Sequence, residues 1–368
     1  VVSASEGTAT SQEELILSQC RDAASLRQYE VMMKKGAELK RLGKASGNET
    51  IELTGESYEI RGMISLRDTT DITTRINHLQ EKAEEAERNG EWKAVCTYGS
   101  PVSLYYHFVA NDFSQASLYA FKCLTAARKQ NDAIAEINAL SALASIYFTK
   151  RESSGYSYAL EAYNMAQKIH SLPSLYGATC NLANYLYNQG KPAEALQYLQ
   201  EATSIKDSLR MEWENAYLYS FFGDIYNALG NDAQAEKYYT LGLRDYPHTT
   251  VYDKAYAHIC YALYLISRKR YQDALAQLYT TNEITSRNKI SIFDTEIALY
   301  QSMSQEKLGN FKEALDAHKR YMDAYQKVTT EANAKEFAIL DLRYRVAQEK
   351  SINAAQSVEI MRRGWIIF

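Results

Sequence analysis

The stretch Ala216–Pro247 decides the fold, and it reads AYLYSFFGDIYNALGNDAQAEKYYTLGLRDYP. Apolar residues recur with helical spacing on both sides of Gly230-Asn231, which predicts two helices joined by a tight turn. Gly223 and Ala235 are small, so we expect the two helices to cross there, because larger side chains would hold the backbones apart. Pro247 has no N–H donor and is expected to end the second helix.

Similar hairpin patterns recur along the chain. Aligned on the small residue of the second helix, they fall at Ala116, Ala159, Ala195, Ala235, Ala274 and Ala314. The spacings are 43, 36, 40, 39 and 40 residues, and an insertion at Glu152–Ser154 accounts for the first two. A single hairpin cannot bury its apolar face, so neighbouring copies are expected to stack into a solenoid of about seven to eight hairpins.

The order of aromatic and small residues in these hairpins resembles the tetratricopeptide repeat (TPR), with aromatic side chains where that pattern has Trp, Leu and Phe. The matching positions are Tyr219, Phe222, Gly223, Tyr226, Ala235, Tyr239 and Pro247. The resemblance implies an all-α, TPR-type solenoid over residues 11–328, followed by a long C-terminal helix. It also implies a protein- or peptide-binding function without catalytic residues, cofactor or metal.

Composition excludes several classes of function. The chain has 368 residues and a net charge of −4, so it lacks the basic surface expected of a protein that binds nucleic acid. The six histidines show no metal-ligand spacing, and no glycine-rich phosphate loop or serine elbow is present. The five cysteines form no C-x-x-C pair and are expected to be small core residues. The 30 tyrosines fit either helix packing or an aromatic binding surface.

The two ends of the chain differ from the repeats. Residues 1–10 fit a signal-peptide remnant, from the small-residue pattern Val2-Ser3-Ala4, or a disordered tail. Apolar residues from Phe337 to Trp365 are spaced three and four apart, so residues 329–361 fit a coiled-coil helix that forms a homodimer or a helix that caps the solenoid. Residues 362–368 fit the start of a truncated transmembrane helix or an apolar plug.

A second resemblance rests on the segment Leu340–Arg345, LDLRYR, together with the preceding repeats and the apolar end. This combination resembles the exported sensor region of membrane-bound TPR regulators common in Bacteroidetes. It implies a single-pass anchored location on the periplasmic face of the inner membrane, with a histidine kinase or helix-turn-helix output domain beyond the span. Arg362 and Arg363 depart from the positive-inside tendency. The alternative is a self-contained cytoplasmic scaffold or adaptor that mediates protein–protein interaction.

The first helix of each hairpin is expected to line a concave groove. The residues expected on this face are Tyr105, Phe108, Ser141, Ser145, Phe148, Asn184, Tyr187, Tyr217, Asp224, Asn227 and Tyr256. This set has no Lys or Arg, which argues against the gripping of a terminal carboxylate. A neutral surface of Tyr, Asn and Ser suits an extended peptide, a helix or a segment of the same chain. The alternative is a solvated face without a ligand.

Overall fold

The computed structural model describes residues 11–68, 71–288, 290–291 and 293–328. Within them the chain forms 16 α-helices and one short 3-10 helix, η1. Their bounds are α1 Ser11–Ser25, α2 Tyr29–Ser46, α3 Glu49–Leu66, α4 Ile72–Asn89, α5 Trp92–Phe108, α6 Phe113–Gln130, α7 Ala133–Thr149, α8 Gly155–Lys168, α9 Leu172–Asn188, α10 Pro192–Ser208, η1 Glu212–Glu214, α11 Asn215–Ala228, α12 Asp232–Gly242, α13 Val251–Ser267, α14 Tyr271–Arg287, α15 Asp294–Lys307 and α16 Phe311–Val328.

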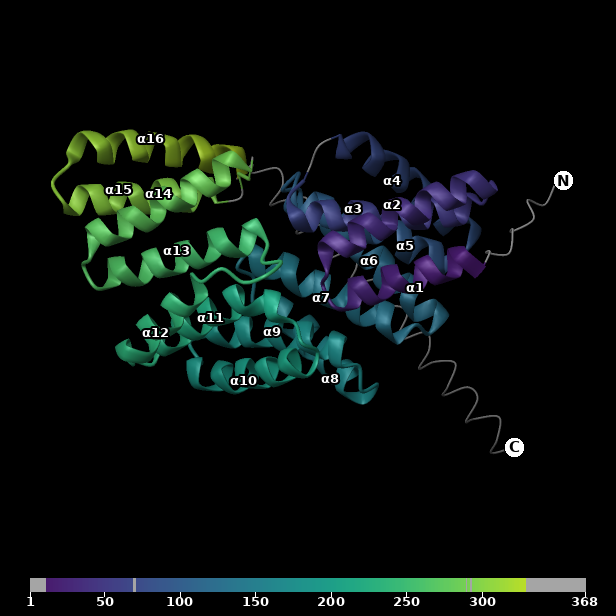
Figure 1. Cartoon of the computed structure of the whole chain (residues 1–368), viewed down its shortest axis with the longest axis horizontal. Helices are drawn as coiled ribbons and strands as arrows, with labels where there is room; N and C mark the ends of the chain where they lie inside the picture. Colours follow the sequence, from purple (N-terminus) through teal and green to yellow (C-terminus); the bar gives the residue numbers. More distant parts are fainter. Residues whose placement is uncertain (1–10, 69–70, 289, 292, 329–368) are drawn as a thin grey trace, which may run out of the picture.

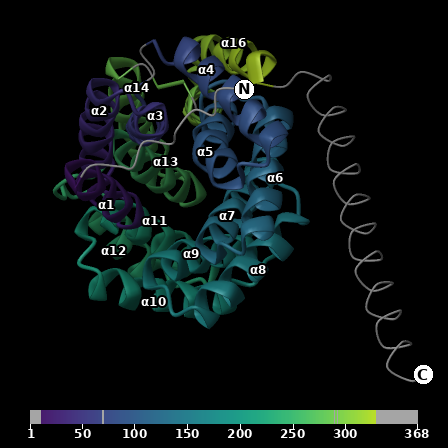
Figure 2. The same cartoon turned by 90° about the vertical axis from the view of Figure 1, so that its right-hand side faces the viewer.

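The prediction of an all-α repeat solenoid is confirmed. Consecutive helices pack against one another along the chain, and helices two apart also touch, as expected of stacked hairpins (Figure 1). Seen along the long axis, the helices follow one another around a central axis (Figure 2). The N-terminal helices also contact helices near the C-terminal end of the solenoid. The contact is made by Arg67, directly after α3, whose guanidinium lies over the ring of Tyr252 in α13. The solenoid therefore completes a turn and contacts itself.

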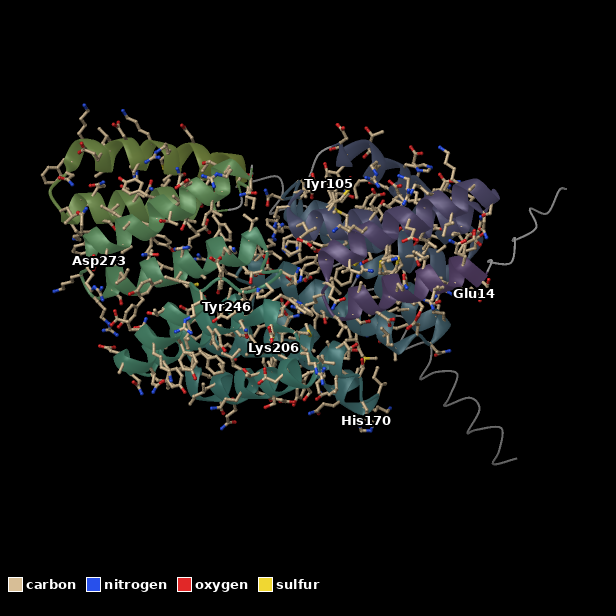
Figure 3. The ribbon with its side chains drawn as sticks, in the orientation of Figure 1. Glu14, Tyr105, His170, Lys206, Tyr246 and Asp273 are labelled. Atoms are coloured by element: carbon tan, nitrogen blue, oxygen red, sulfur yellow. The ribbon has the colours of Figure 1, made fainter. Side chains whose placement is uncertain are left out.

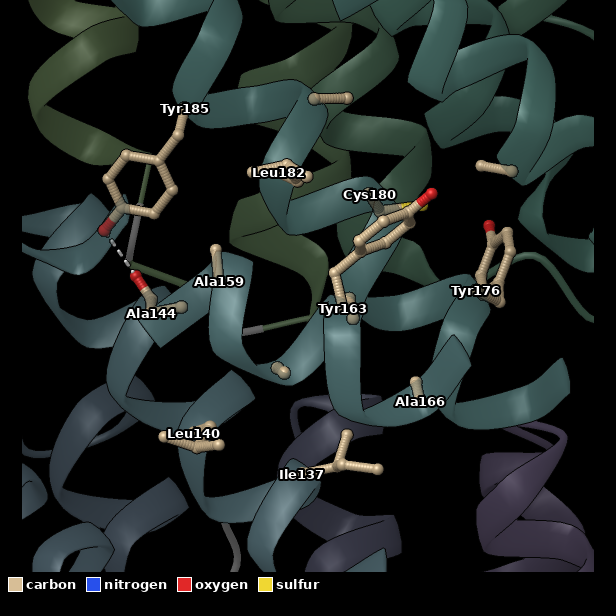
Figure 4. Close-up of a cluster of buried hydrophobic side chains, with 14 of the residues drawn as sticks. Ile137, Leu140, Ala144, Ala159, Tyr163, Ala166, Tyr176, Cys180, Leu182 and Tyr185 are labelled. Carbon is tan, nitrogen blue, oxygen red and sulfur yellow. Dashed lines mark hydrogen bonds between the residues drawn. The ribbon is translucent and has the colours of Figure 1, made fainter. Parts of the chain in front are cut away.

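The small residues aligned in the sequence lie in the even-numbered helices and are buried. Ala116, Ala159, Ala195, Ala235 and Ala274 are 0% exposed, and Ala314 is 7% exposed. Larger side chains fill the space around these helix crossings, as Figure 4 shows for α7, α8 and α9. In that cluster the Tyr185 hydroxyl donates to the carbonyl oxygen of Ala144 over 2.8 Å. Much of the tyrosine content is therefore used in packing, with buried hydroxyl groups paired to helix carbonyls or carboxylates.

The stretch that predicts the hairpin forms α11 and α12. Gly230 has φ of +74°, a left-handed turn conformation that glycine adopts without steric cost. The Asn231 side chain caps α12 by accepting a hydrogen bond from the Gln234 N–H over 3.2 Å. Gly223 faces the ring of Tyr239, which leaves no space for a Cβ atom. Helix α12 ends at Gly242, before Pro247, so the proline follows the helix end instead of causing it.

Helices α2 and α3 pack with their backbones in direct contact, which the sequence reading does not anticipate. Gly36 of α2 and Gly55 of α3 face each other, and Gly43 and Gly62 likewise lie against main-chain atoms of the other helix, at Glu52 and Met33. A Cβ atom built on Gly55 would lie 2.7 Å from the Gly36 carbonyl oxygen. The seven-residue spacing within each pair keeps the glycines on one helix face, so this hairpin is the most closely packed part of the N-terminal turn.

The expectation of a single-pass membrane anchor is contradicted. None of the described helices combines the length and the apolar character needed to cross a bilayer. This finding conflicts with the single-pass, anchored location implied by the second resemblance. The segments on which it depended, residues 329–361 and 362–368, lie outside the described residues, as do residues 1–10.

Candidate functional site

A large cavity runs through the inside of the solenoid. It has a volume of about 3190 Å³, and every odd-numbered helix from α1 to α15 contributes side chains to it. Pockets for small molecules usually measure about 300 to 1,000 Å³. The cavity is therefore large enough for a segment of polypeptide.

Seven of the eleven residues expected in the groove line this cavity. They are Phe108, Ser141, Ser145, Phe148, Asn184, Tyr217 and Tyr256. They come from α5, α7, α9, α11 and α13, which places residues far apart in sequence along one continuous wall. The helical-repeat register brings them together because each residue occupies the same face of its own hairpin.

Four of the expected residues do not line the cavity. The Tyr105 hydroxyl, labelled in Figure 3, lies 3.1 Å from the Thr73 hydroxyl of α4. The Asp224 carboxylate accepts a hydrogen bond from Tyr239 over 2.6 Å, and the Asn227 side chain accepts one from Arg268 over 2.9 Å. Tyr187 packs edge-on against Phe221 at 5.7 Å between ring centroids. These side chains are occupied in contacts between neighbouring helices.

Side-chain amides form a row along α9 that sequence reasoning found only in part. Asn181, Asn184 and Asn188 line the cavity at positions three and four apart, and Asn138 of α7 continues the row. An amide carries both donors and an acceptor, so such a row can pair with the N–H and C=O groups of an extended backbone. The sequence does contain a signal for this row. Asn138 and Asn181 are 43 residues apart, which is also the spacing between the aligned residues Ala116 and Ala159.

Tyrosines continue the wall from the amide row. The Asn184 amide donates to the Tyr217 hydroxyl over 2.7 Å, and the Tyr217 ring lies 5.8 Å from that of Tyr256. Burial raises the pKa of Tyr217 well above its usual value, so its hydroxyl stays protonated. Because that oxygen accepts from Asn184, its own proton is left for a ligand acceptor.

Arginines from the first helices also reach the cavity, and sequence reasoning missed them. Arg27, Arg61 and Arg67 all line it. Arg27 forms an ion pair with Glu214 at 3.3 Å, and its guanidinium lies 5.0 Å from the ring centroid of Tyr176. No local pattern marks these positions, because they face the cavity only once the solenoid has completed its turn.

The carboxylate of Asp253 lies near these arginines. It accepts a hydrogen bond from the Thr250 hydroxyl over 2.6 Å. Burial, and then the charge of Glu214, raise its pKa to about 7, although Thr250, Arg27 and Arg67 act in the opposite direction. Asp253 is therefore partly protonated near neutral pH.

This pKa predicts a dependence of stability on pH. The folded chain retains a proton on Asp253 that the unfolded chain releases near pH 4, so stability falls as pH rises from about 4 through about 7. We expect the free energy of unfolding to drop between about pH 5.5 and about pH 8 by more in the wild type than in Asp253→Asn. Urea unfolding at both pH values measures the difference, and equal drops would contradict it.

The described walls of the cavity show no metal site. Among the described residues, no group of three or more His, Cys, Asp or Glu side chains could hold a metal ion. His107 borders the cavity, and burial, followed by the charge of Arg67, lowers its pKa to about 3. Its Nε2 atom lies 2.9 Å from the Thr149 hydroxyl, so the ring is a neutral, hydrogen-bonded part of the wall.

Comparisons with known proteins agree with the helical-repeat fold. Residues 177–206, in α9 and α10, match the family described as Tetratricopeptide repeat, and no curated protein matches the sequence. The crystal structure of NprR in complex with its cognate peptide NprX matches with a TM-score of 0.61 and 17% identity, over 92% of this chain and 96% of that one.

Two further structures are similar at lower scores. The Rap protein complexed with Competence and Sporulation Factor has a TM-score of 0.51 and 12% identity, over 89% of this chain and 100% of that one. The apo form of the quorum sensor NprR from B. thuringiensis has a TM-score of 0.51 and 14% identity, over 85% and 99%. At such identities the likeness shows the fold alone. This chain therefore folds as a TPR-like helical-repeat solenoid, and its residues 177–206 carry a tetratricopeptide repeat.

Proposed function

We propose that the chain is a non-catalytic scaffold that binds an extended peptide or protein segment inside its solenoid. The observation that carries this proposal is the row of amides on α9 in a cavity of about 3190 Å³. Asn181, Asn184 and Asn188 would pair with the ligand backbone, while Tyr217 and Tyr256 would pack against its side chains. The solved structures of NprR with its cognate peptide NprX and of the Rap protein with Competence and Sporulation Factor support the same use of this fold.

Affinity selection tests the proposal. A pool of random heptapeptides is passed over the immobilised full chain, and the retained peptides are identified and synthesised. In the double variant Asn184→Ala, Asn188→Ala, two backbone hydrogen bonds are lost, each worth about 1 kcal/mol, so we expect the Kd of retained peptides to rise about thirtyfold. Removal of Asn184 also frees the Tyr217 hydroxyl, which is a further cost.

The matched control is Asn164→Ala in α8, where the same amide is removed from an exposed position outside the cavity. Its Kd is expected to equal that of the wild type. Retention of no peptide from the pool, or equal Kd values in the double variant and the wild type, would contradict binding through the amide row.

A sensory function is the second candidate, and one observation favours it. The contacts that close the turn, between Arg27 and Glu214 and between Arg67 and Tyr252, involve side chains that also line the cavity. A ligand that touches these residues would change how the first helices sit on the later ones. Small-angle scattering with and without a retained peptide tests this: a sensor changes its radius of gyration, whereas a static scaffold keeps it.

A further inference from the structure

Arg67 is held between two aromatic rings at the edge of the cavity. Its guanidinium lies 4.7 Å from the ring centroid of Phe108 in α5 and 4.6 Å from that of Tyr252 in α13. Its Nε and Nη1 atoms are buried and have no hydrogen-bond partner among the described residues. Arg67 also forms no ion pair with any described carboxylate within 4.0 Å. The two rings thus orient the guanidinium, and no described carboxylate forms an ion pair with it.

Arg61, one turn and a half earlier on α3, has the same character. It lines the cavity, its Nε atom is buried without a hydrogen-bond partner in the described part of the chain, and its guanidinium lies over the ring of Tyr58 at 5.5 Å. Buried arginine N–H groups normally pair with carboxylates or carbonyls, because an unpaired donor costs free energy. Two such arginines in one cavity wall can therefore donate to an acceptor on a ligand.

The charges around Arg67 leave this end of the cavity positive. From the facing elements come Arg27 and Glu214, which pair with each other, and Asp253, which bonds to Thr250. Tyr29 of α2, Tyr252 of α13 and His107 of α5 are further titratable neighbours, and all three are neutral near pH 7. Arg61 and Arg67 thus keep charges that the surrounding groups do not fully balance.

A continuous path of side chains joins Arg67 to the amide row. Tyr252 stacks on Tyr256 at 6.4 Å between ring centroids, Tyr256 lies 5.8 Å from Tyr217, and Tyr217 is hydrogen-bonded to Asn184. All of these side chains line the same cavity. An extended peptide paired with the amides needs only a few more residues along the tyrosines to reach the guanidinium.

We propose that Arg67, assisted by Arg61, binds a carboxylate of the peptide ligand, so that the cavity selects acidic peptides that end or carry an acid at this point. The inference rests on the proposed peptide-binding function and specifies its ligand class. A guanidinium pairs with a carboxylate through charge-assisted hydrogen bonds, and the flanking rings keep it in one orientation. The carboxylate is either the free C-terminus or an Asp or Glu side chain.

Four pools of random heptapeptides test the proposal on the full chain. The pools combine a free or amidated C-terminus with Asp and Glu present or replaced by Asn and Gln. We expect at least one carboxylate-bearing pool to be retained about tenfold or more above the pool without carboxylates. Loss of retention on amidation would show that the C-terminal carboxylate is recognised. Loss of retention when Asn and Gln replace Asp and Glu would show that a side-chain carboxylate is recognised.

Variants separate this inference from the general function. In Arg67→Gln the preference for the carboxylate-bearing pools over the carboxylate-free pool should disappear. Arg41→Gln removes the same charge from an exposed site on α2 outside the cavity and should keep the preference. If Arg67→Gln fails to retain any pool, Arg61→Gln decides: a weaker preference supports the proposal, and an unchanged preference overturns it.

The remaining outcomes are also distinct. Equal retention of all four pools by the wild type would overturn the carboxylate site and leave peptide binding intact. Retention of no pool would overturn both proposals.

Discussion

Gly55→Ala is expected to destabilise the N-terminal turn by about 3 kcal/mol, at the upper end of the cost of overpacking. The added Cβ would meet the Gly36 carbonyl oxygen at 2.7 Å and the backbone of Lys40 more closely still. Main-chain atoms cannot move aside as a flexible side chain can, so α2 and α3 must separate. Urea unfolding measures the loss, and amide hydrogen exchange should show it in residues 29–66.

The sign of this effect makes the test informative. In the middle of an unconstrained helix, Gly to Ala stabilises by roughly 0.5–1 kcal/mol, because alanine loses less backbone entropy on folding. Lys34→Ala, at an exposed position of α2, is the control and should change stability by less than about 0.5 kcal/mol. A neutral or stabilising Gly55→Ala would show that the two backbones are not in contact.

Glu214→Gln is expected to loosen the closure of the solenoid by about 2 kcal/mol. Its carboxylate is 9% exposed and pairs with Arg27, whose side chain is 33% exposed. Breaking a buried ion pair costs about 3–5 kcal/mol, and the partial exposure of Arg27 reduces this figure. The Tyr176 hydroxyl, 3.0 Å from Glu214, can still donate to the new amide oxygen.

A double-mutant cycle isolates the pair. Arg27→Met and Glu214→Gln should each destabilise the protein, and the double variant should lose less than the sum of the two. Hydrogen exchange is expected to increase in α1 and α2 first, because these helices flank Arg27. Strict additivity of the two free-energy changes would mean that this ion pair does not hold the first helices to η1.

The sequence predicts the hairpins well because their signals are local. Ala195 and Ala235 mark helix crossings, and Gly190 and Gly230, both with φ of +74°, mark turns that need a left-handed residue. These requirements act within one hairpin, so a repeated pattern is enough to detect them. The glycine contacts of α2 and α3 also have a pattern in the sequence, since a second glycine follows seven residues after Gly36 and seven residues after Gly55.

The cavity is predictable only in part, for a geometric reason. Asn184 and Tyr217 face it because of the repeat register, which the sequence contains. Arg27 and Arg67 face it because the first helices meet η1 and α13 after a full turn, and that depends on the summed curvature of all hairpins. Asp224 has the expected register, but its carboxylate accepts a hydrogen bond from Tyr239 and does not line the cavity. This pairing depends on local side-chain packing, which the repeat pattern does not specify.

The most direct test of peptide binding inside the solenoid is photo-crosslinking. A retained heptapeptide is synthesised with a benzophenone side chain, irradiated on the full chain, and the attached residues are identified by mass spectrometry. We predict attachment on the inner faces of α7, α9 and α11, around Ser145, Asn188 and Tyr217. Attachment confined to outward helices such as α10 or α12 would contradict a ligand site in the cavity.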